Sequence, residues 1–185
     1  MKHRQVQALC EGAVMVAAAQ ALGYLKLYEM PNGGSVSFIM LPIIIYCVRW
    51  GFGRGLLAAL ALGTLQFLLD GGFALTWVSI LGDYVIAYGA LGAAGLFSKA
   101  KGGFFWGTAA GTLARFLVIW VVGATVWAEY MPDAFLNMTM TSPWLYSAIY
   151  NGIYVGLCGL LCLVVGAAAW RTPLGKYLRA EDLRQ

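Results

Sequence analysis

Apolar runs of about 20 residues recur along the whole of this 185-residue chain, and they constrain its fold more than any other feature. A helix needs about 20 apolar residues to cross the hydrocarbon core of a bilayer. Charged residues make up only 11% of the sequence, against about 25% in a typical soluble domain. The runs do not show the alternation of a transmembrane barrel strand. The sequence therefore predicts an all-α membrane protein.

Six transmembrane helices are expected, in a single integral membrane domain that covers residues 1–185. The predicted spans are about 6–25, 36–50, 53–70, 74–97, 103–128 and 144–170. The first run lacks a small-residue cleavage site, so we interpret it as a span, with a signal peptide as the alternative. The second is short, follows a turn-forming cluster and contains Pro42. It predicts either irregular backbone that lines a site or a kinked structural helix.

Lysine and arginine fall almost entirely on one side of this topology. With six spans both termini share a side, and that side holds Lys2, Arg4, Arg49, Arg54, Lys99, Lys101, Arg171, Lys176, Arg179 and Arg184. The other side holds Lys26, together with Glu29, Asp70, Glu129 and Asp133. Because cytoplasmic loops carry the excess of basic residues, both termini are expected to be cytoplasmic. The longer outer loops, near 28–35 and 129–143, would form either a lid over an outward-facing pocket or passive connectors.

Two ionisable residues, Asp83 and Arg115, lie deep inside the predicted spans. A charge at bilayer depth is costly, and it normally serves a ligand site or a buried partner. The carboxylate of Asp83 could contact a cationic ligand, or it could form a structural ion pair with Arg115. Both hold if Arg115 supports Asp83 from behind. Asp83 is therefore the first candidate for a ligand contact.

Aromatic residues gather towards the outer ends of the spans, where an interfacial belt is the simplest interpretation. Tyr146 and Tyr150 are different, because they share one helix face at the start of the last span. Asn151 lies beside them and brings an amide that needs partners into an apolar setting. Together with Asp83, these groups would make a cage for a flat, polar and possibly cationic molecule.

Motifs of catalytic and metal centres are absent from the sequence, which has no P-loop, no HExxH and no GxSxG. No catalytic residue and no metal site is therefore expected. The four cysteines complete no zinc site and are expected to be small buried residues; they are Cys10, Cys47, Cys158 and Cys162.

A stripe of small residues marks the first span, where Ala13, Ala17 and Ala21 recur at four-residue spacing. Stripes of this kind let helices pack closely. This one would either pack inside the bundle or dock against a separate membrane subunit.

Four stretches of the chain resemble, in the right order, the ThiT family of thiamin-specific S components of energy-coupling factor (ECF) transporters. MPNGGSVS at 30–37 with MLPI at 40–43 is similar to their first loop and second helix. LGDY at 81–84 with AYGALGAAGLF at 87–97 resembles their fourth helix. ARF at 114–116 with Gly123 resembles the fifth, and PWLYSAIYNG at 143–152 the sixth.

The resemblance implies a six-helix S-component bundle in a bacterial plasma membrane. Such a subunit is not an enzyme: it captures thiamin from outside with high affinity. Its implied partners are a transmembrane coupling protein and two cytoplasmic ATPases, which use the ATP, so no cofactor is expected on this chain. The alanine stripe of the first helix is then the docking surface.

The resemblance also implies roles for individual residues. Asp83 and Tyr84 would contact the ligand, and Trp127 would stack on it. Tyr146 and Asn151 match a further pair of ligand contacts, and Tyr150 joins this predicted site through its shared helix face.

Two positions depart from the family pattern. Ile119 stands where the fifth helix often carries a histidine, and the first loop lacks the tryptophan that contacts ligand in some members. Both departures remove ligand contacts, so a thiamin precursor or another vitamin stays an alternative ligand.

The rival functions are an ion-coupled secondary carrier that uses Asp83 and Arg115, and a membrane scaffold without a small ligand.

Overall fold

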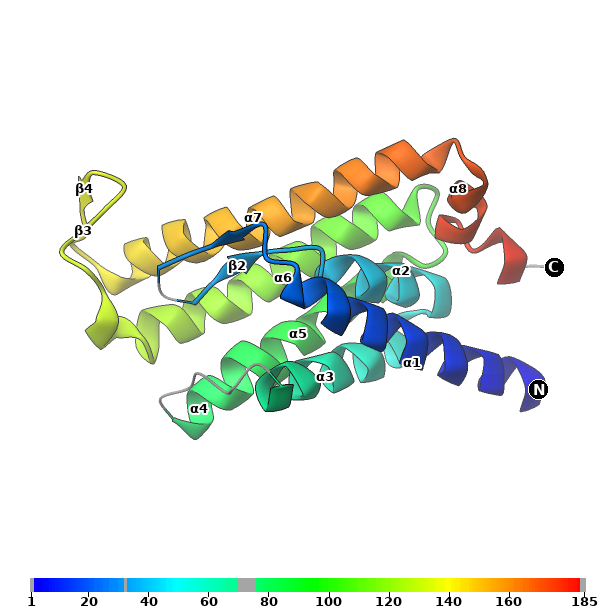
Figure 1. Ribbon diagram of the computed structural model, residues 1–185, viewed down its shortest axis with the longest axis horizontal. Coiled ribbons are helices and arrows are strands. Elements are labelled where there is room, and N and C mark those ends of the chain that lie inside the picture. Colours follow the sequence, from blue (N-terminus) through cyan, green and yellow to red (C-terminus); the bar gives the residue numbers. More distant parts are fainter. Residues whose placement is uncertain (1, 32, 70–75, 184–185) are drawn as a thin grey trace.

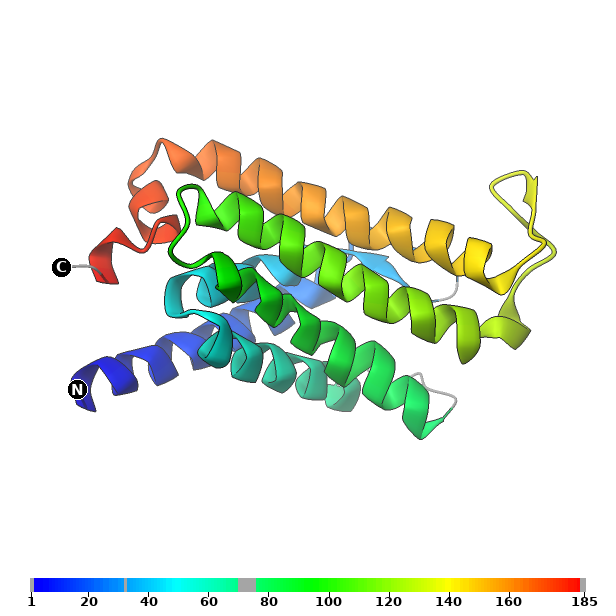
Figure 2. The same ribbon diagram turned by 180° about the vertical axis from the view of Figure 1, so that it is seen from behind.

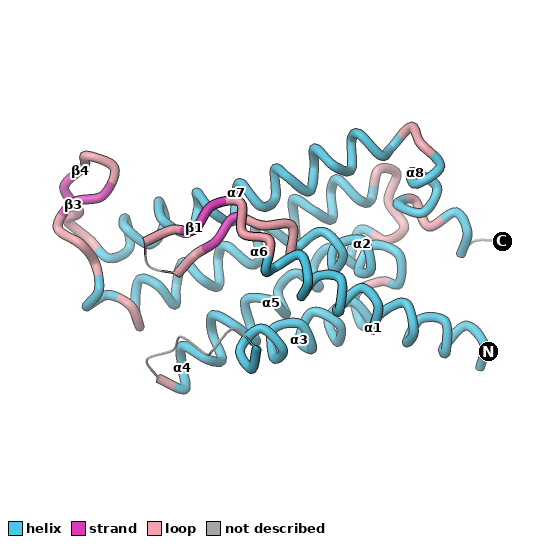
Figure 3. Tube along the Cα trace, in the orientation of Figure 1, coloured by secondary structure: helices cyan, strands magenta, loops and turns pink. Residues whose placement is uncertain are grey.

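The computed structural model describes residues 2–31, 33–69 and 76–183, and it is a bundle of long helices with two small hairpins (Figures 1 and 3). Residues 70 and 74–75, at the ends of two predicted spans, lie outside the described residues, as does Arg184. The bundle is built from α1 (Lys2–Tyr24), α2 (Met40–Trp50), α3 (Phe52–Leu69), a helical segment from Trp77 to Phe97, α6 (Gly103–Thr125) and α7 (Pro143–Trp170).

The helical segment Trp77–Phe97 changes its type along its length. It consists of α4 (Trp77–Ser79), a π-helical stretch (Ile80–Ile86), α5 (Ala87–Gly89) and a 3₁₀ stretch (Ala90–Phe97). The smaller elements are β1 (Tyr28–Glu29), which pairs with β2 (Ser35–Val36), and β3 (Ala134–Phe135), which pairs with β4 (Met138–Thr139). Two 3₁₀ turns (Ala128–Tyr130 and Glu181–Leu183) and α8 (Pro173–Leu178) complete the described elements.

Five of the described helices are long and apolar enough to cross a membrane, in agreement with five of the predicted spans. The prediction for the second span, 36–50, is wrong at its start. Val36 belongs to a hairpin strand, and α2 begins only at Met40, so Pro42 lies in the first turn, where proline is tolerated. The 11 residues of α2 extend about 16 Å at 1.5 Å per residue, which is too short to span a bilayer alone.

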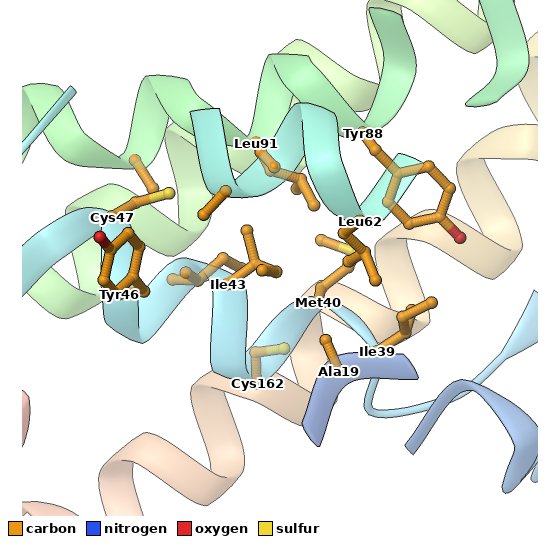
Figure 4. Packing of buried hydrophobic residues seen from close by; sticks show 14 of the residues in the cluster. Ala19, Ile39, Met40, Ile43, Tyr46, Cys47, Leu62, Tyr88, Leu91 and Cys162 are labelled. Carbon is orange, nitrogen blue, oxygen red and sulfur yellow. The ribbon is translucent and has the colours of Figure 1, made fainter. Parts of the chain in front are cut away.

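The short helix α2 is the centre of the core. Met40, Ile43, Ile44 and Cys47 are fully buried among side chains from α1, α3, the segment 77–97 and α7. Figure 4 shows Ile43 and Met40 facing Leu62 and Leu91 from the neighbouring helices. Because α2 is surrounded by protein on all sides, its sequence is apolar around its whole circumference.

Both termini lie at the same end of the bundle, and the β3–β4 hairpin lies at the other end (Figures 1 and 2). At the terminal end α8 and the last 3₁₀ turn fold back against α2. The Arg49 guanidinium is buried there and donates to the Glu11 and Asp182 carboxylates, at 2.5 Å from Nε and 2.8 Å from Nη2 respectively. It also lies 3.4 Å from the ring centroid of Tyr177, whose hydroxyl donates to Glu11 at 2.7 Å. The sequence analysis counted Arg49 only among the basic residues of the inner side and gave no sign of this network.

The alanine stripe of α1 lies on the outside of the bundle. Ala13, Ala17 and Ala21 are exposed, whereas Val16 and Ala19 on the other face of the helix are buried. Of the two interpretations, packing of the stripe inside the bundle is therefore excluded. Burial of the cysteines was predicted for all four, but Cys10 is exposed on α1, because it falls on the outward face of that helix.

Candidate functional site

A cavity of about 620 Å³ opens in the half of the bundle away from the termini. Its walls come from the end of α1, the β1–β2 hairpin, the start of α2, α3, the segment 77–97, α6 and α7. All six predicted site residues line it: Asp83, Tyr84, Trp127, Tyr146, Tyr150 and Asn151. The structure thus brings together side chains from three helices that are far apart in the sequence.

Asp83 and Tyr84 lie in the π-helical stretch Ile80–Ile86. Such stretches are rare and occur frequently at functional sites, because the wider turn redirects side chains. Asp83 Oδ2 accepts a hydrogen bond of 2.7 Å from the indole Nε1–H of Trp127. The Tyr84 ring packs edge-on against Phe67 of α3, with 5.5 Å between the ring centroids.

Trp127 lies just beyond α6, which ends at Thr125 and not at the predicted 128. Its ring packs edge-on against Tyr130, with the centroids 5.8 Å apart, and both residues line the cavity. An indole at a helix end is less confined by its own backbone than one inside a helix. The position therefore gives the cavity an aromatic wall beside the Asp83 carboxylate.

Arg115 lies in the middle of α6 and lines the same cavity, and it is 7% exposed. The structural ion pair that was one interpretation of Asp83 does not form: no ion pair joins Asp83 to Arg115 in the described part of the chain. The guanidinium instead lies 4.0 Å from the ring centroid of Tyr88, a cation–π contact. Asp83 is bonded to Trp127 and remains in the wall of the cavity.

The α7 wall carries a ladder of aromatic rings. Tyr146 and Tyr150 lie with their ring centroids 5.5 Å apart, and Tyr150 and Tyr154 follow at 5.9 Å. Tyr154 was missed by the sequence analysis, although it continues the same four-residue spacing. Tyr88, four residues after Tyr84, also lines the cavity and was also missed.

Asn151 is held in one orientation by neighbours on two helices. Its Nδ2 donates to Ser147 Oγ at 3.0 Å and to the Ile119 carbonyl at 3.4 Å. Ser147 in turn donates to the Trp120 carbonyl at 2.8 Å. Since the donor side of the amide is engaged, the Asn151 Oδ1 is available as a fixed hydrogen-bond acceptor in the cavity wall. Ile119, where the family often has histidine, is 3% exposed and also lines the cavity.

The two outer loops cover the cavity. In the first, the Gly34 N–H donates to the Tyr150 hydroxyl at 3.0 Å, and a Cβ at Gly34 would approach within 2.8 Å of the Tyr154 ring. In the second, the Phe135 ring packs edge-on against Tyr146 at 5.5 Å. Both loops therefore contact the aromatic ladder of α7, which favours the interpretation of a lid over that of passive connectors.

Groups that could bind a metal ion do not cluster in the described residues: no three His, Cys, Asp or Glu side chains come together. The cavity instead combines the carboxylates of Asp83 and Glu29, the cations of Arg115 and Lys26, two side-chain amides and several aromatic rings. Such a set can bind a planar molecule by stacking, hydrogen bonds and charge, but it provides no activated nucleophile.

Comparison with known proteins supports this picture. The family model described as Thiamine transporter protein (Thia_YuaJ) matches residues 9–174. Thiamine transporter ThiT of Bacillus subtilis (strain 168) is 32% identical over 179 residues, which cover 89% of this chain and 90% of that protein. Thiamine transporter ThiT of Lacticaseibacillus paracasei is 27% identical over 180 residues, covering 89% of this chain and 87% of the relative.

A solved structure, that of ThiT from Listeria monocytogenes, has the same fold. It superposes with a TM-score of 0.82 at 22% sequence identity, covering 94% of this chain and 98% of that chain. The predicted all-α membrane bundle is thereby confirmed.

Proposed function

The chain belongs to the thiamine transporter protein family, and we propose that it is the subunit that captures thiamin with high affinity for an ECF-type importer. It is a multi-pass bacterial membrane protein of a transporter family rather than an enzyme. The observation that carries the proposal is the cavity in which the Asp83 carboxylate lies beside an aromatic wall, with the β1–β2 hairpin forming part of the lining.

The chemistry of thiamin matches the two sides of this cavity. Its thiazolium ring is cationic, and a carboxylate beside an aromatic face suits it. Asp83 would supply the charge, and Trp127, beside it, would supply the stacking surface. The planar aminopyrimidine carries an amino group, and the fixed Oδ1 of Asn151 would accept a hydrogen bond from it. Tyr84, Tyr146 and Tyr150 would supply phenols and further ring contacts.

Ligand capture would then be completed by the β1–β2 hairpin. The bond from Gly34 to Tyr150 anchors this hairpin to α7 directly above the aromatic ladder. A closed hairpin would shield the ligand from water, which strengthens every charged contact inside the cavity.

Docking on an energy-coupling module would use the exposed alanine stripe of α1. Small residues let another transmembrane helix approach closely, and Ala13, Ala17 and Ala21 are exposed on that face. The expected partners are a transmembrane coupling protein and two cytoplasmic ATPases, which hydrolyse the ATP. In this proposal the chain itself holds no cofactor, and its single domain covers the whole sequence.

The proposal is tested by tryptophan fluorescence of the detergent-purified protein during thiamin titration. Trp127 beside the thiazolium should be quenched saturably at submicromolar thiamin. Asp83→Asn should weaken binding by about tenfold or more, because a hydrogen bond to a charged group contributes about 1.5–3 kcal/mol. Trp127→Ala should abolish most of the quenching.

Trp77→Ala is the matched control, because Trp77 is 80% exposed and does not line the cavity. It should change the total fluorescence of the seven-tryptophan chain and leave the titration midpoint in place. A flat wild-type response up to high micromolar thiamin would refute the thiamin assignment. Thiamin precursors and other vitamins would then be titrated in the same way.

A further inference from the structure

Arg115 is a buried charge that forms no ion pair with any described residue. Its side chain lies in the middle of α6, is 7% exposed and lines the cavity. No carboxylate of the described residues lies within ion-pair distance of it, and its Nε has no hydrogen-bond partner there. A guanidinium carries five N–H donors, and the contacts of Arg115 with Tyr88, a cation–π contact and a side-chain hydrogen bond, leave the Nε–H without a partner. Leaving such a charge unpaired at bilayer depth is costly.

The cavity also holds the Asp83 carboxylate, beside a Lys26–Glu29 pair whose charges offset each other, and Asp83 cannot serve two cations at once. Asp83 accepts its hydrogen bond from Trp127, and it lies outside ion-pair distance of Arg115. Without ligand, Asp83 and Arg115 balance each other in net charge although they are not paired. When a cationic ligand occupies the carboxylate, the positive charge of Arg115 is left without a counter-charge. Binding of a cation at Asp83 therefore creates a demand for an anion near Arg115.

We propose that Arg115 is the centre of a small-anion site at the inner end of the cavity, which takes chloride together with a cationic ligand. The proposal rests on the proposed function, because the cation in question is thiamin. Tyr88, Tyr154 and Cys158 line the cavity around the guanidinium. The two phenols can donate hydrogen bonds to an anion that the guanidinium attracts. An anion here makes the loaded cavity electrically neutral.

Linkage makes the proposal quantitative. If the anion and the cationic ligand stabilise each other, each raises the affinity of the other by the same factor. Thiamin should therefore bind about tenfold more tightly when chloride is raised from about 1 mM to about 100 mM, a factor within the usual range of coupling. Gluconate replaces chloride so that the ionic strength stays constant.

Two variants and one neutral ligand make the experiment specific. Arg115→Gln should bind thiamin with no dependence on chloride, whereas Arg115→Lys, which keeps the charge, should retain the dependence. Arg54→Gln changes an exposed arginine outside the cavity and should behave as wild type. The neutral aminopyrimidine half of thiamin leaves the charge of Asp83 free, so its binding should not respond to chloride.

Chloride-35 line broadening in NMR detects bound chloride directly and does not depend on the fluorescence titration with thiamin. Broadening by the wild-type protein that thiamin enhances and Arg115→Gln removes would support the site. A wild-type thiamin affinity that does not change with chloride, or a dependence that persists in Arg115→Gln, would overturn it. Absence of thiamin quenching at every chloride concentration would overturn the thiamin assignment, and the line broadening would still decide whether Arg115 binds an anion.

Discussion

Trp127 donates its indole N–H to the Asp83 carboxylate across 2.7 Å, and this bond joins the end of α6 to the π-helical stretch Ile80–Ile86. The two residues are 44 positions apart, and both line the cavity. The hydrogen bond fixes the carboxylate next to an aromatic face. It thereby couples the residue that supplies charge to the residue that supplies stacking.

Replacing Trp127 by phenylalanine should separate these two contributions. Trp127→Phe keeps an aromatic face and removes the N–H donor, so thiamin binding should weaken by about 1 kcal/mol, the typical net contribution of one hydrogen bond. Trp127→Ala should cost more, because the stacking surface is lost as well. Calorimetric titration of both variants measures the difference, and equal losses would show that the ring face is irrelevant.

Loosening the covering hairpin should change how fast ligand leaves. Tyr150→Phe removes the acceptor of the Gly34 N–H and keeps the ring in the aromatic ladder. We expect thiamin dissociation to accelerate by about two- to tenfold, the effect of losing one hydrogen bond of about 0.5–1.5 kcal/mol. Stopped-flow fluorescence measures the rate. Tyr24→Phe, at an exposed position, is the control and should leave the rate unchanged.

A single methyl group in α3 should disturb the site. A Cβ at Gly63 would collide with the carbonyl oxygen of Tyr84, so Gly63→Ala must push the π-helical stretch away from α3. Overpacking of this kind costs about 1–3 kcal/mol. We expect a lower melting temperature and weaker thiamin binding. Gly53→Ala in the same helix meets no atom within 4 Å and should leave both quantities at or above their wild-type values.

The two faces of α1 should respond in opposite ways to a large side chain. Ala17→Trp on the exposed stripe should leave the stability and thiamin affinity of the isolated chain intact and abolish thiamin uptake with the coupling module. Ala19→Trp points into the core, where Ala19 is fully buried, and should destabilise the isolated chain itself. Uptake assays beside thermal melts separate these outcomes. Undiminished uptake by Ala17→Trp would contradict docking at the stripe.

Acid should release the C-terminal segment before it affects the rest of the chain. The hydrogen bond from Arg49 holds the pKa of the Asp182 carboxyl below its usual value. A carboxyl whose pKa is lower in the folded state stabilises the fold above its unfolded pKa of about 3.9, and this stabilisation is lost as the pH falls through the folded value. The protection factors of the amides in residues 173–183, which correct for the intrinsic pH dependence of hydrogen exchange, should therefore be high at neutral pH and fall below about pH 4. Asp182→Asn should show low protection at both pH values.

The sequence by itself determined the helical membrane fold and the approximate spans, and it pointed to six residues that line the cavity. Apolar runs long enough to cross a bilayer have few alternatives to helices, because backbone groups in lipid must be satisfied within the segment. Asp83 could be singled out because a carboxylate in such a run is costly, and is normally found only at a ligand site or beside a buried partner. The shared helix face of Tyr146 and Tyr150 followed from helix periodicity alone, and the same spacing could have found Tyr154.

Only the tertiary structure decided which groups meet. Asp83 is bonded to Trp127 and not to Arg115, because the end of α6 carries the indole to the π-helical turn. The sequence predicted a span at 36–50, but hairpin pairing at Val36 shortens it to the 11-residue α2. From the sequence, Arg49 is one of several basic residues on the inner side. In the folded chain its guanidinium donates hydrogen bonds to Asp182 of the C-terminal segment. Periodicity and composition depend on residues that are neighbours along the chain. These contacts depend instead on how the helices pack, and the packing is set by the side chains of all the helices together.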